Sequence, residues 1–277
     1  MNAKMNRWAW LCPWLAIALA ATVLAWWGLS WLTALLAALL LVCPALVLWG
    51  LFTVRSLPLA EPLPRTDGMT MNWAAPFYDL YCPLVGFGLA FRARTLAQAA
   101  IRPGERILDV GCGTGVLTRL ALAAAQPGGV AVGIDPSWKM IQVARQTVAR
   151  LGGGVEFKLA AIEGLPFPDA SFDLVLSSLM LHHLPPATKD RGLAEVYRVL
   201  RPAGRLVAVD IGRPSKPLWW LLLWPLTMMP SVADNLCGRV PDHLRRAGFS
   251  QVECRGRRAG LIAFWTAVKP QPGGVVP

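Results

Sequence analysis

The sequence predicts an α/β fold in which a seven-stranded, mostly parallel sheet carries helices on both faces. Between about residues 105 and 268, short β-type runs alternate with segments of helical periodicity, which is typical of strand–helix–strand crossovers. The first of these strands runs directly into a glycine-rich loop. A long uncharged stretch precedes this domain and predicts two membrane-spanning helices.

The N-terminal stretch contains no charged residue and no histidine from Trp8 to Val54. It is about twice as long as one helix that crosses a bilayer core. We therefore expect a transmembrane hairpin within residues 1–54, with spans at about 8–27 and 31–53. Gly28 and Ser30 supply the turn, beside tryptophans suited to the membrane interface.

A cleaved secretory signal peptide is the alternative for this stretch, because Ala18-Leu19-Ala20 resembles a cleavage site. The apolar residues continue as far as Val54, which a cleaved signal does not explain. We therefore favour the hairpin.

Flanking charges predict the orientation of the hairpin. Lys4 and Arg7 precede the first span, Arg55 and Arg65 follow the second, and the connection has no charge. By the positive-inside rule, both termini and the domain are expected to be cytoplasmic, in a multi-pass protein of the cell (inner) membrane. Residues 55–70 contain three prolines and no periodicity, so we interpret them as a linker.

The domain is expected over residues 71–268. Its first half begins with apolar helical patterning over about 72–100. A strand follows at ERILDV and ends in glycines, and GVAVGID (129–135) predicts a second strand. A helix is expected over 137–151, because its apolar residues recur on one face.

The second half continues the alternation. Strands are expected at VEFKLA (155–160), FDLVLSS (172–178) and GRLVAVDIG (204–212), with a helix over about 187–200 that ends before Arg201-Pro202. A helix that runs into Gly248 and two β-type runs, QVECRGR and GLIAFWTAV, complete the domain, and residues 269–277 form a tail.

The glycine loop has its glycines at every second position, 111, 113 and 115. A dinucleotide-binding fingerprint needs its third glycine one position later, where this chain has Val116, so an NAD-dependent dehydrogenase is disfavoured. The backbone can instead approach a ligand without side chains in between. Asp135 ends the next strand, 20 residues after Gly115, and is placed to accept hydrogen bonds from both hydroxyls of a ribose.

These motifs resemble class I S-adenosylmethionine (SAM)-dependent methyltransferases. ILDVGCGTG resembles their first motif, and GIDPSWKMIQVAR resembles their second-strand acidic motif. EGLPFPDASFDLVLSSLMLHHL and RVLRPAGRLVAVD resemble the next blocks of the ubiquinone/menaquinone C-methyltransferase-like branch. The resemblance covers about residues 72–265 and implies a Rossmann-like methyltransferase fold that binds SAM. Transmembrane spans are not part of the usual family pattern.

The resemblance also implies which residues hold SAM. The family's usual aspartate for the adenine amino group falls at Ala161, so adenine recognition is expected from backbone near Ile162 and from Glu163. Tyr78 is similar to the family's entry tyrosine, and a tyrosine face suits a sulfonium. The expected cofactor-binding residues are Tyr78, Asp109, Gly111, Cys112, Gly113, Gly115, Asp135, Pro136, Ile162, Glu163 and Ser177. No metal site is expected.

His182 and His183 follow the fourth predicted strand, where ligands bind in such sheets. Either imidazole could remove a proton from the methyl acceptor, and a structural role in the loop is the alternative. A carbon acceptor on a hydroquinone needs this deprotonation, whereas an amine only needs to be neutral.

The segment 215–231 contains three tryptophans, and no charge occurs from Pro217 to Pro230. Tryptophan is preferred at the membrane interface. Arg213 and Lys216 before the segment, and Arg239, Arg245 and Arg246 after it, suit lipid phosphates. We interpret the segment as a membrane-facing insertion that opens the active site to a lipid-dissolved acceptor. An apolar lid over a soluble substrate is the alternative.

The sequence therefore predicts a membrane-anchored SAM-dependent methyltransferase that acts on a hydrophobic small molecule or lipid, such as a prenylated quinol. A phospholipid amine head group is the second substrate class, and a non-catalytic SAM-binding membrane protein is the second functional class. The net charge of +11 would also suit nucleic acid. No nucleic-acid partner is expected, because the chain lacks an N-P-P-Y-type motif.

Overall fold

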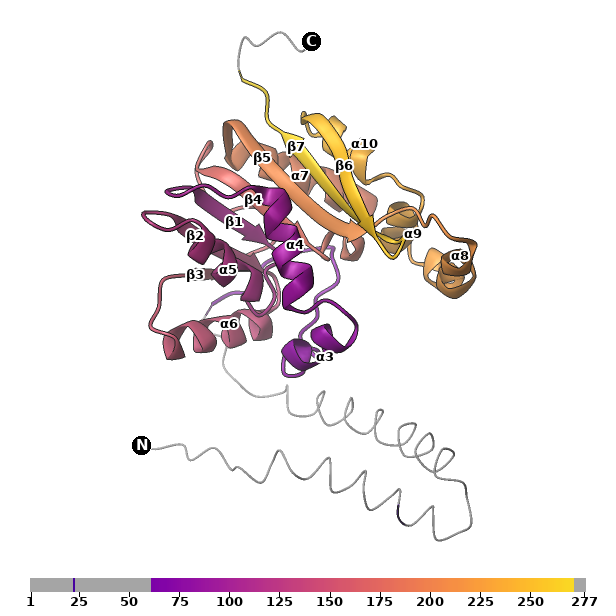
Figure 1. Ribbon diagram of the computed structural model, residues 1–277, viewed down its shortest axis with the longest axis horizontal. Coiled ribbons are helices and arrows are strands. Elements are labelled where there is room, and N and C mark those ends of the chain that lie inside the picture. Colours follow the sequence, from indigo (N-terminus) through magenta and orange to yellow (C-terminus); the bar gives the residue numbers. More distant parts are fainter. Residues whose placement is uncertain (1–21, 23–60, 272–277) are drawn as a thin grey trace. The chain divides into compact units, whose positions relative to one another are not determined.

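The computed structural model describes residue 22 and residues 61–271 (Figure 1). Apart from residue 22, the predicted transmembrane hairpin lies outside these residues, as do the start of the predicted linker and most of the predicted tail. Within the described part of the chain, no helix combines the length and the apolar character that a membrane crossing requires.

The predicted sheet is confirmed. Seven strands lie in the order β3-β2-β1-β4-β5-β7-β6, and β7 is antiparallel to both of its neighbours. The remaining pairs, β1 with β2 and β4, β2 with β3, and β4 with β5, are parallel. The strands are β1 (Arg106–Val110), β2 (Val130–Asp135), β3 (Glu156–Leu159), β4 (Phe172–Ser178), β5 (Leu200–Ile211), β6 (Ser250–Arg258) and β7 (Ile262–Val268).

Helices cover both faces of this sheet (Figure 1). α4 (Leu89–Ala99) and α5 (Val116–Ala124) pack on one face, and α7 (Pro186–Val199) and α10 (Val240–Arg246) pack on the other. α6 (Trp138–Arg150) packs against β2 and β3. α3 (Tyr78–Leu84) precedes α4. The short α5 lies outside the ranges predicted from periodicity, because VLTRLALAA is apolar over much of its surface.

α6 shows how local sequence fixes an element beside the site. The Ser137 hydroxyl accepts a hydrogen bond from the Met140 amide and caps the helix. Its predicted apolar face, Met140, Ile141, Ala144 and Val148, is buried. This packing holds the end of β2, and therefore Asp135, in a fixed position at the carboxyl edge of the sheet.

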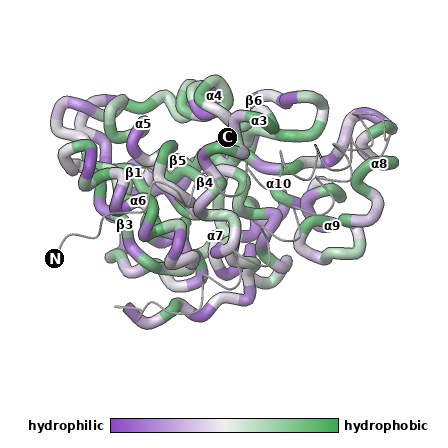
Figure 2. The backbone as a smooth tube through the Cα atoms, turned by 90° about the horizontal axis from the view of Figure 1, so that it is seen from below, coloured by the Kyte–Doolittle hydropathy of each residue, from purple (hydrophilic) through white to green (hydrophobic). Residues whose placement is uncertain are grey.

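The segment 215–231 forms two short helical pieces, α8 (Pro217–Leu223) and η3 (Trp224–Met228), and leads into α9 (Pro230–Leu236). No residue of α8 or η3 is buried, and the exposed fraction of Met228 reaches 80%. The hydrophobic stretches of α8 are green in Figure 2. The segment is therefore an apolar projection from the domain rather than part of its core.

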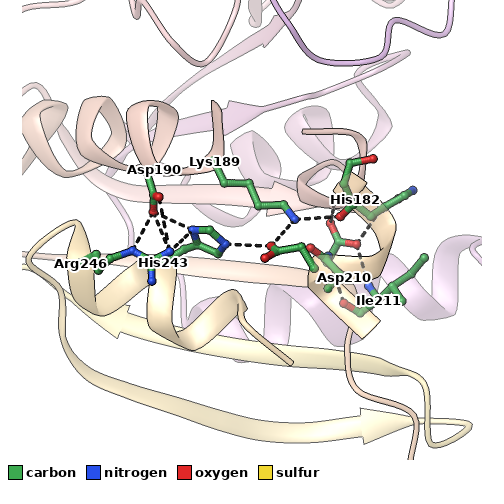
Figure 3. Close-up of polar contacts among 10 residues, drawn as sticks. His182, Lys189, Asp190, Asp210, Ile211, His243 and Arg246 are labelled. Carbon is green, nitrogen blue, oxygen red and sulfur yellow. Dashed lines mark hydrogen bonds and ion pairs between the residues drawn. The ribbon is translucent and has the colours of Figure 1, made fainter. Parts of the chain in front are cut away.

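A buried ionic network fastens α9 to the domain (Figure 3). The Lys189 ammonium donates to the Asp234 carboxylate at 2.7 Å and to the Ser231 carbonyl at 2.9 Å. His243 lies between Asp234 and Asp190, at 2.8 Å and 2.6 Å. Because unpaired buried charge is costly, these partners fix α9 against α7 and α10, and the projection leaves the domain from a rigid base.

Candidate active site

The candidate site lies at the carboxyl edge of β1, β2 and β4, where the glycine loop connects β1 to α5. Gly111 has a φ of +73°, and a Cβ there would lie 2.3 Å from the Met180 side chain. The amides of Gly111 and Cys112 both donate to the Ile134 carbonyl at 2.9 Å. The loop is thus held flat against the end of β2, and a side chain at residue 111 would not fit.

Asp135 is oriented by two backbone amides. Its carboxylate accepts from the Gly113 amide at 3.0 Å and from the Ser137 amide at 2.8 Å. Burial raises the pKa of Asp135 to about 6, although these two hydrogen bonds oppose the rise. Each oxygen keeps lone-pair capacity for a further donor, so the carboxylate can accept from a ribose diol.

Asp109 lies in a smaller recess beside the glycine loop. It is buried and accepts a hydrogen bond from the Thr118 hydroxyl at 2.6 Å. Burial raises its pKa to about 7, and the hydrogen bond from Thr118 lowers it in part. Arg92, Cys112 and Ser178 line the same recess. Burial also raises the pKa of the Cys112 thiol well above its usual value, which leaves this cysteine unreactive.

The larger polar pocket extends from Gly111 and Gly113 past Asp135 and Pro136 to Ile162 and Glu163. Part of the segment predicted as a linker contributes to this pocket, because Thr66, Gly68 and Met69 form one wall. Residues 66–69 contact the domain through Asp67, which pairs with Arg191 at 2.5 Å, and through the Met69 amide, which donates to the His183 carbonyl at 3.0 Å.

The two carboxylate oxygens of Glu163 have different hydrogen-bond surroundings. Oε1 accepts from the Thr66 hydroxyl at 2.8 Å and from the Asp67 amide at 3.3 Å. Oε2 is buried and has no hydrogen-bond partner among the described residues. A buried acceptor without a donor is costly, so a ligand that brings an N–H group would satisfy it. Ala161 is buried and offers no such acceptor in its side chain.

A second, mostly apolar cavity of about 550 Å³ adjoins the polar pocket. Four residues line both spaces: Met71, Tyr78, Leu179 and His183. Trp73, Phe77, Tyr81, Phe87, Ile211, Leu261 and Ile262 complete most of the apolar wall. A molecule in this cavity would therefore lie next to a ligand bound along the glycine loop.

His182 contributes the oriented polar group of this cavity (Figure 3). Its Nδ1 lies 2.7 Å from Oδ1 of Asp210, which is fully buried at the end of β5. Burial acts to raise the pKa of Asp210, but the charge and hydrogen bond of His182 hold it below its usual value. The ionised carboxylate therefore favours the tautomer that carries the proton on Nδ1 and leaves Nε2 as a proton acceptor.

His183 differs from its neighbour. Burial, together with the adjacent His182, lowers the pKa of His183 to about 4, so it is neutral near pH 7. Its ring lies against that of His182 in a tilted arrangement, with 4.1 Å between centroids and 38° between the ring planes. The two histidines are therefore not equivalent, and His182 is the better placed proton acceptor.

Two of the residues expected to bind cofactor do not line these cavities. Ser177 is buried within β4, and Ser178 lines the recess instead. A Cβ on Gly115 would meet the Phe157 ring at 2.3 Å, so this glycine permits packing of α5 and β3. The structure also adds Asp210, Arg92 and residues 66–69 to the site. The sequence could have indicated Asp210 as a site residue, because it is the acidic residue near the carboxyl end of the predicted strand GRLVAVDIG.

Comparisons with known proteins agree with this geometry. Residues 107–204 match the family described as Methyltransferase domain. The chain is 35% identical over 243 residues to the ubiquinone/menaquinone biosynthesis C-methyltransferase UbiE of Bordetella parapertussis, covering 79% of this chain and 92% of that protein. It is 32% identical over 208 residues to a demethylmenaquinone methyltransferase of Symbiobacterium thermophilum, covering 64% and 81%.

Among solved structures, a SAM-dependent methyltransferase from Aquifex aeolicus is similar, with a TM-score of 0.54 and 21% identity over 73% of this chain and all of that chain. This likeness supports the fold. The residues of the polar pocket and of the recess beside it fit SAM, since Asp135 can accept from the ribose and Asp109 lies buried beside the glycine loop. The chain is a SAM-dependent methyltransferase and belongs to the class I family, in the branch similar to the ubiquinone/menaquinone C-methyltransferases.

Proposed function

We propose that this enzyme methylates a ring carbon of a hydrophobic, membrane-dissolved aromatic acceptor such as a prenylated quinol. The observation that carries the proposal is the apolar cavity of about 550 Å³ that adjoins the cofactor pocket and is lined by His182, whose Nδ1 pairs with Asp210 outside the cavity lining. Among the residues that the structure describes, its lining includes no carboxylate, whereas a cationic amine head group would need one for charge compensation. The names of the curated relatives point to the same acceptor class.

SAM supplies an activated methyl group, and the protein has to position the acceptor and exclude water. In carbon methylation, the new C–C bond replaces a C–H bond, so the ring proton has to leave. Nε2 of His182 can take that proton, or the hydroxyl proton of the quinol, while Nδ1–H donates to Asp210. The resulting imidazolium would be stabilised by the buried carboxylate of Asp210.

Labelling of a natural substrate tests this function. Membranes that contain the full-length enzyme are incubated with methyl-labelled SAM, and the lipid extract is separated into neutral aromatic lipids and phospholipids. We expect label on a quinol-type species, in a bond that resists mild acid and base. Label on a phospholipid amine would contradict the proposal, and so would SAM binding without transfer to any extractable species.

We further propose that residues 1–54 anchor the enzyme in the cell membrane with both termini and the domain on the cytoplasmic side. The support is the absence of charge from Trp8 to Val54 between Lys4 and Arg7 on one side and Arg55 and Arg65 on the other. Single cysteines added at positions 3 and 274, in a protein without other cysteines, should react with an impermeant maleimide only after the cells are opened. Labelling of intact cells at either position would overturn this topology.

A further inference from the structure

A group of positive charges without acidic partners lies near the base of the apolar projection. Arg94, Arg213, Lys216, Arg257 and Arg258 have no carboxylate within ion-pair distance among residues 61–271. Of the other arginines among residues 61–271, eight each pair with an Asp or Glu: Arg145, Arg191, Arg198, Arg201, Arg205, Arg245, Arg246 and Arg255. Arg65, Arg92, Arg102, Arg106, Arg119, Arg150 and Arg239 also lack an ion pair within this range, so the first group is set apart by its place between two exposed apolar surfaces. The charge of the first group, which we call the cation cluster, is uncompensated.

The cation cluster is held together by backbone contacts. Arg94 donates to the Arg257 carbonyl at 3.3 Å, and Arg257 donates to the Arg213 carbonyl at 2.5 Å. Arg258 donates to the Gly86 carbonyl and lies over the rings of Phe87 and Phe91. These contacts fix several positive groups in one region instead of leaving them dispersed.

An exposed apolar surface lies on each side of the cluster. On the α3 side, the exposed side chains are Trp73, Phe77, Leu80, Tyr81 and Leu84, and the exposed fraction of Leu84 is 79%. On the α8–η3 side, they are Leu218, Trp220, Leu221, Leu222, Trp224, Leu226 and Met228. Cys82 is the buried residue of α3, so most apolar residues of this helix are not used for packing within the described part of the chain.

The turn between β6 and β7 joins these two surfaces. Arg258 contacts Gly86 just after α3, and the Ala259 carbonyl accepts from the Trp219 indole of α8 at 2.7 Å. Leu261 of the same turn lines the acceptor cavity, as do Phe77 and Tyr81. α3 and α8 thus flank the turn at the carboxyl edge of the parallel strands (Figure 1), and the cavity is lined from the same region.

We propose that α3, α8–η3 and the cation cluster form one docking surface for an anionic lipid bilayer. Tryptophan and leucine side chains enter the interfacial layer, and the cations meet lipid phosphates. Charge complementarity favours this occupant, since uncompensated cations between two exposed apolar surfaces match the anionic and apolar layers of a bilayer. The docking surface is inferred from the domain itself; only its use as an entrance for the acceptor rests on the proposed function.

Depth measurements on the full-length chain test the docking surface separately from any anchoring by residues 1–54. A nitroxide label replaces Leu84 or Leu222 in a cysteine-free protein in nanodiscs of phosphatidylcholine with or without phosphatidylglycerol. Leu151 is the control, because it is exposed and follows the end of α6 away from the glycine loop. At positions 84 and 222 we expect dissolved oxygen, which concentrates in the bilayer, to relax the nitroxide more strongly than a water-soluble nickel chelate does. At position 151 the nickel chelate should be the stronger relaxant. Aqueous behaviour at 84 and 222 in anionic nanodiscs would overturn the proposal.

The charge requirement is tested with paired substitutions. Arg213→Gln with Arg257→Gln should move the labels at 84 and 222 toward water in anionic nanodiscs. The matched control, Arg245→Gln with Arg255→Gln, removes two positive charges that already have acidic partners and should leave the labels in place. An equal response of the two pairs, at equal thermal stability, would refute the role of the cation cluster. These experiments do not measure methylation, so a negative result would contradict the docking surface without contradicting the proposed acceptor. A negative result in the labelling experiment would likewise leave the docking surface standing.

Discussion

The two adjoining cavities of this enzyme offer a ligand different kinds of contact. The cofactor pocket has two partly buried carboxylates, Asp135 and Glu163, that backbone amides or a hydroxyl hold in place. The proposed acceptor cavity is built mainly from apolar side chains and has one oriented polar group, the His182 imidazole, which Asp210 holds from outside the lining. The first selects a ligand by hydrogen-bond geometry, and the second selects it by size and apolarity.

Because the two cavities differ in this way, substitutions in one should change the affinity for SAM, and substitutions in the other should change the rate of methyl transfer. Loss of a carboxylate in the cofactor pocket leaves donors of the ligand unpaired, so it should change the Kd for SAM. Loss of the histidine in the acceptor cavity should change the rate of transfer and leave SAM affinity as it is. The four residues shared by both cavities should affect both quantities.

The largest effect is expected from His182→Ala. If His182 accepts the acceptor's proton, turnover should fall by about 10² to 10⁴ while the Kd for SAM, measured by calorimetry, stays unchanged. Asp210→Asn should also slow turnover and alter its pH profile, because the wrong imidazole tautomer becomes accessible. Full activity of His182→Ala on a quinol-type acceptor would contradict the assignment of the proton acceptor.

Asp135→Ala should weaken SAM binding strongly. It removes charge-assisted hydrogen bonds to the ribose, each worth roughly 1.5 to 3 kcal/mol. Calorimetry on detergent-purified protein measures the change, and a thermal melt monitors the loop that Asp135 holds through Gly113 and Ser137. Unchanged SAM affinity with an intact melt would exclude Asp135 as the ribose ligand.

Glu163→Gln tests whether the unpaired Oε2 binds the adenine amino group. The wild-type enzyme should prefer S-adenosylhomocysteine to S-inosylhomocysteine, whose carbonyl would face the carboxylate. In the variant an amide can donate to that carbonyl, so the preference should shrink by about tenfold, which corresponds to roughly 1.4 kcal/mol. Glu156→Gln, an exposed carboxylate on β3, is the control. An unchanged preference in Glu163→Gln would remove this residue from adenine recognition.

The smallest expected effect concerns pH. Burial places the pKa of Asp135 at about 6 in the cofactor-free protein, and ribose binding favours the ionised form. Lowering the pH from 8 to 6 should therefore weaken binding of 5′-methylthioadenosine by about twofold, and Asp135→Asn should flatten this dependence. Asp109, whose pKa of about 7 lies in the same range, interacts electrostatically with Asp135, so Asp109→Asn is measured as the control for its share of the response. An equal pH response in the wild type and in Asp135→Asn would show that another group titrates.

Much of the fold was determined by local sequence. Strand runs such as FDLVLSS are continuous and apolar because both faces of a parallel sheet are covered, and β4 occupies those residues. The apolar face of α6 and its Ser137 cap follow helical periodicity and capping chemistry. The glycine loop and the acidic end of β2 also identified the cofactor class, because they are adjacent in sequence to the strands that carry them.

Tertiary structure decided which distant groups meet. His182 and Asp210 lie at the carboxyl ends of β4 and β5, and only the parallel pairing of these strands brings them together. Glu163 meets Thr66 across 97 residues, from a segment without periodicity. The cation cluster likewise gathers residues from α4, from the segment after β5 and from β6. Periodicity indicates which face of an element is buried; it does not specify the partner, because the partner depends on how whole elements pack.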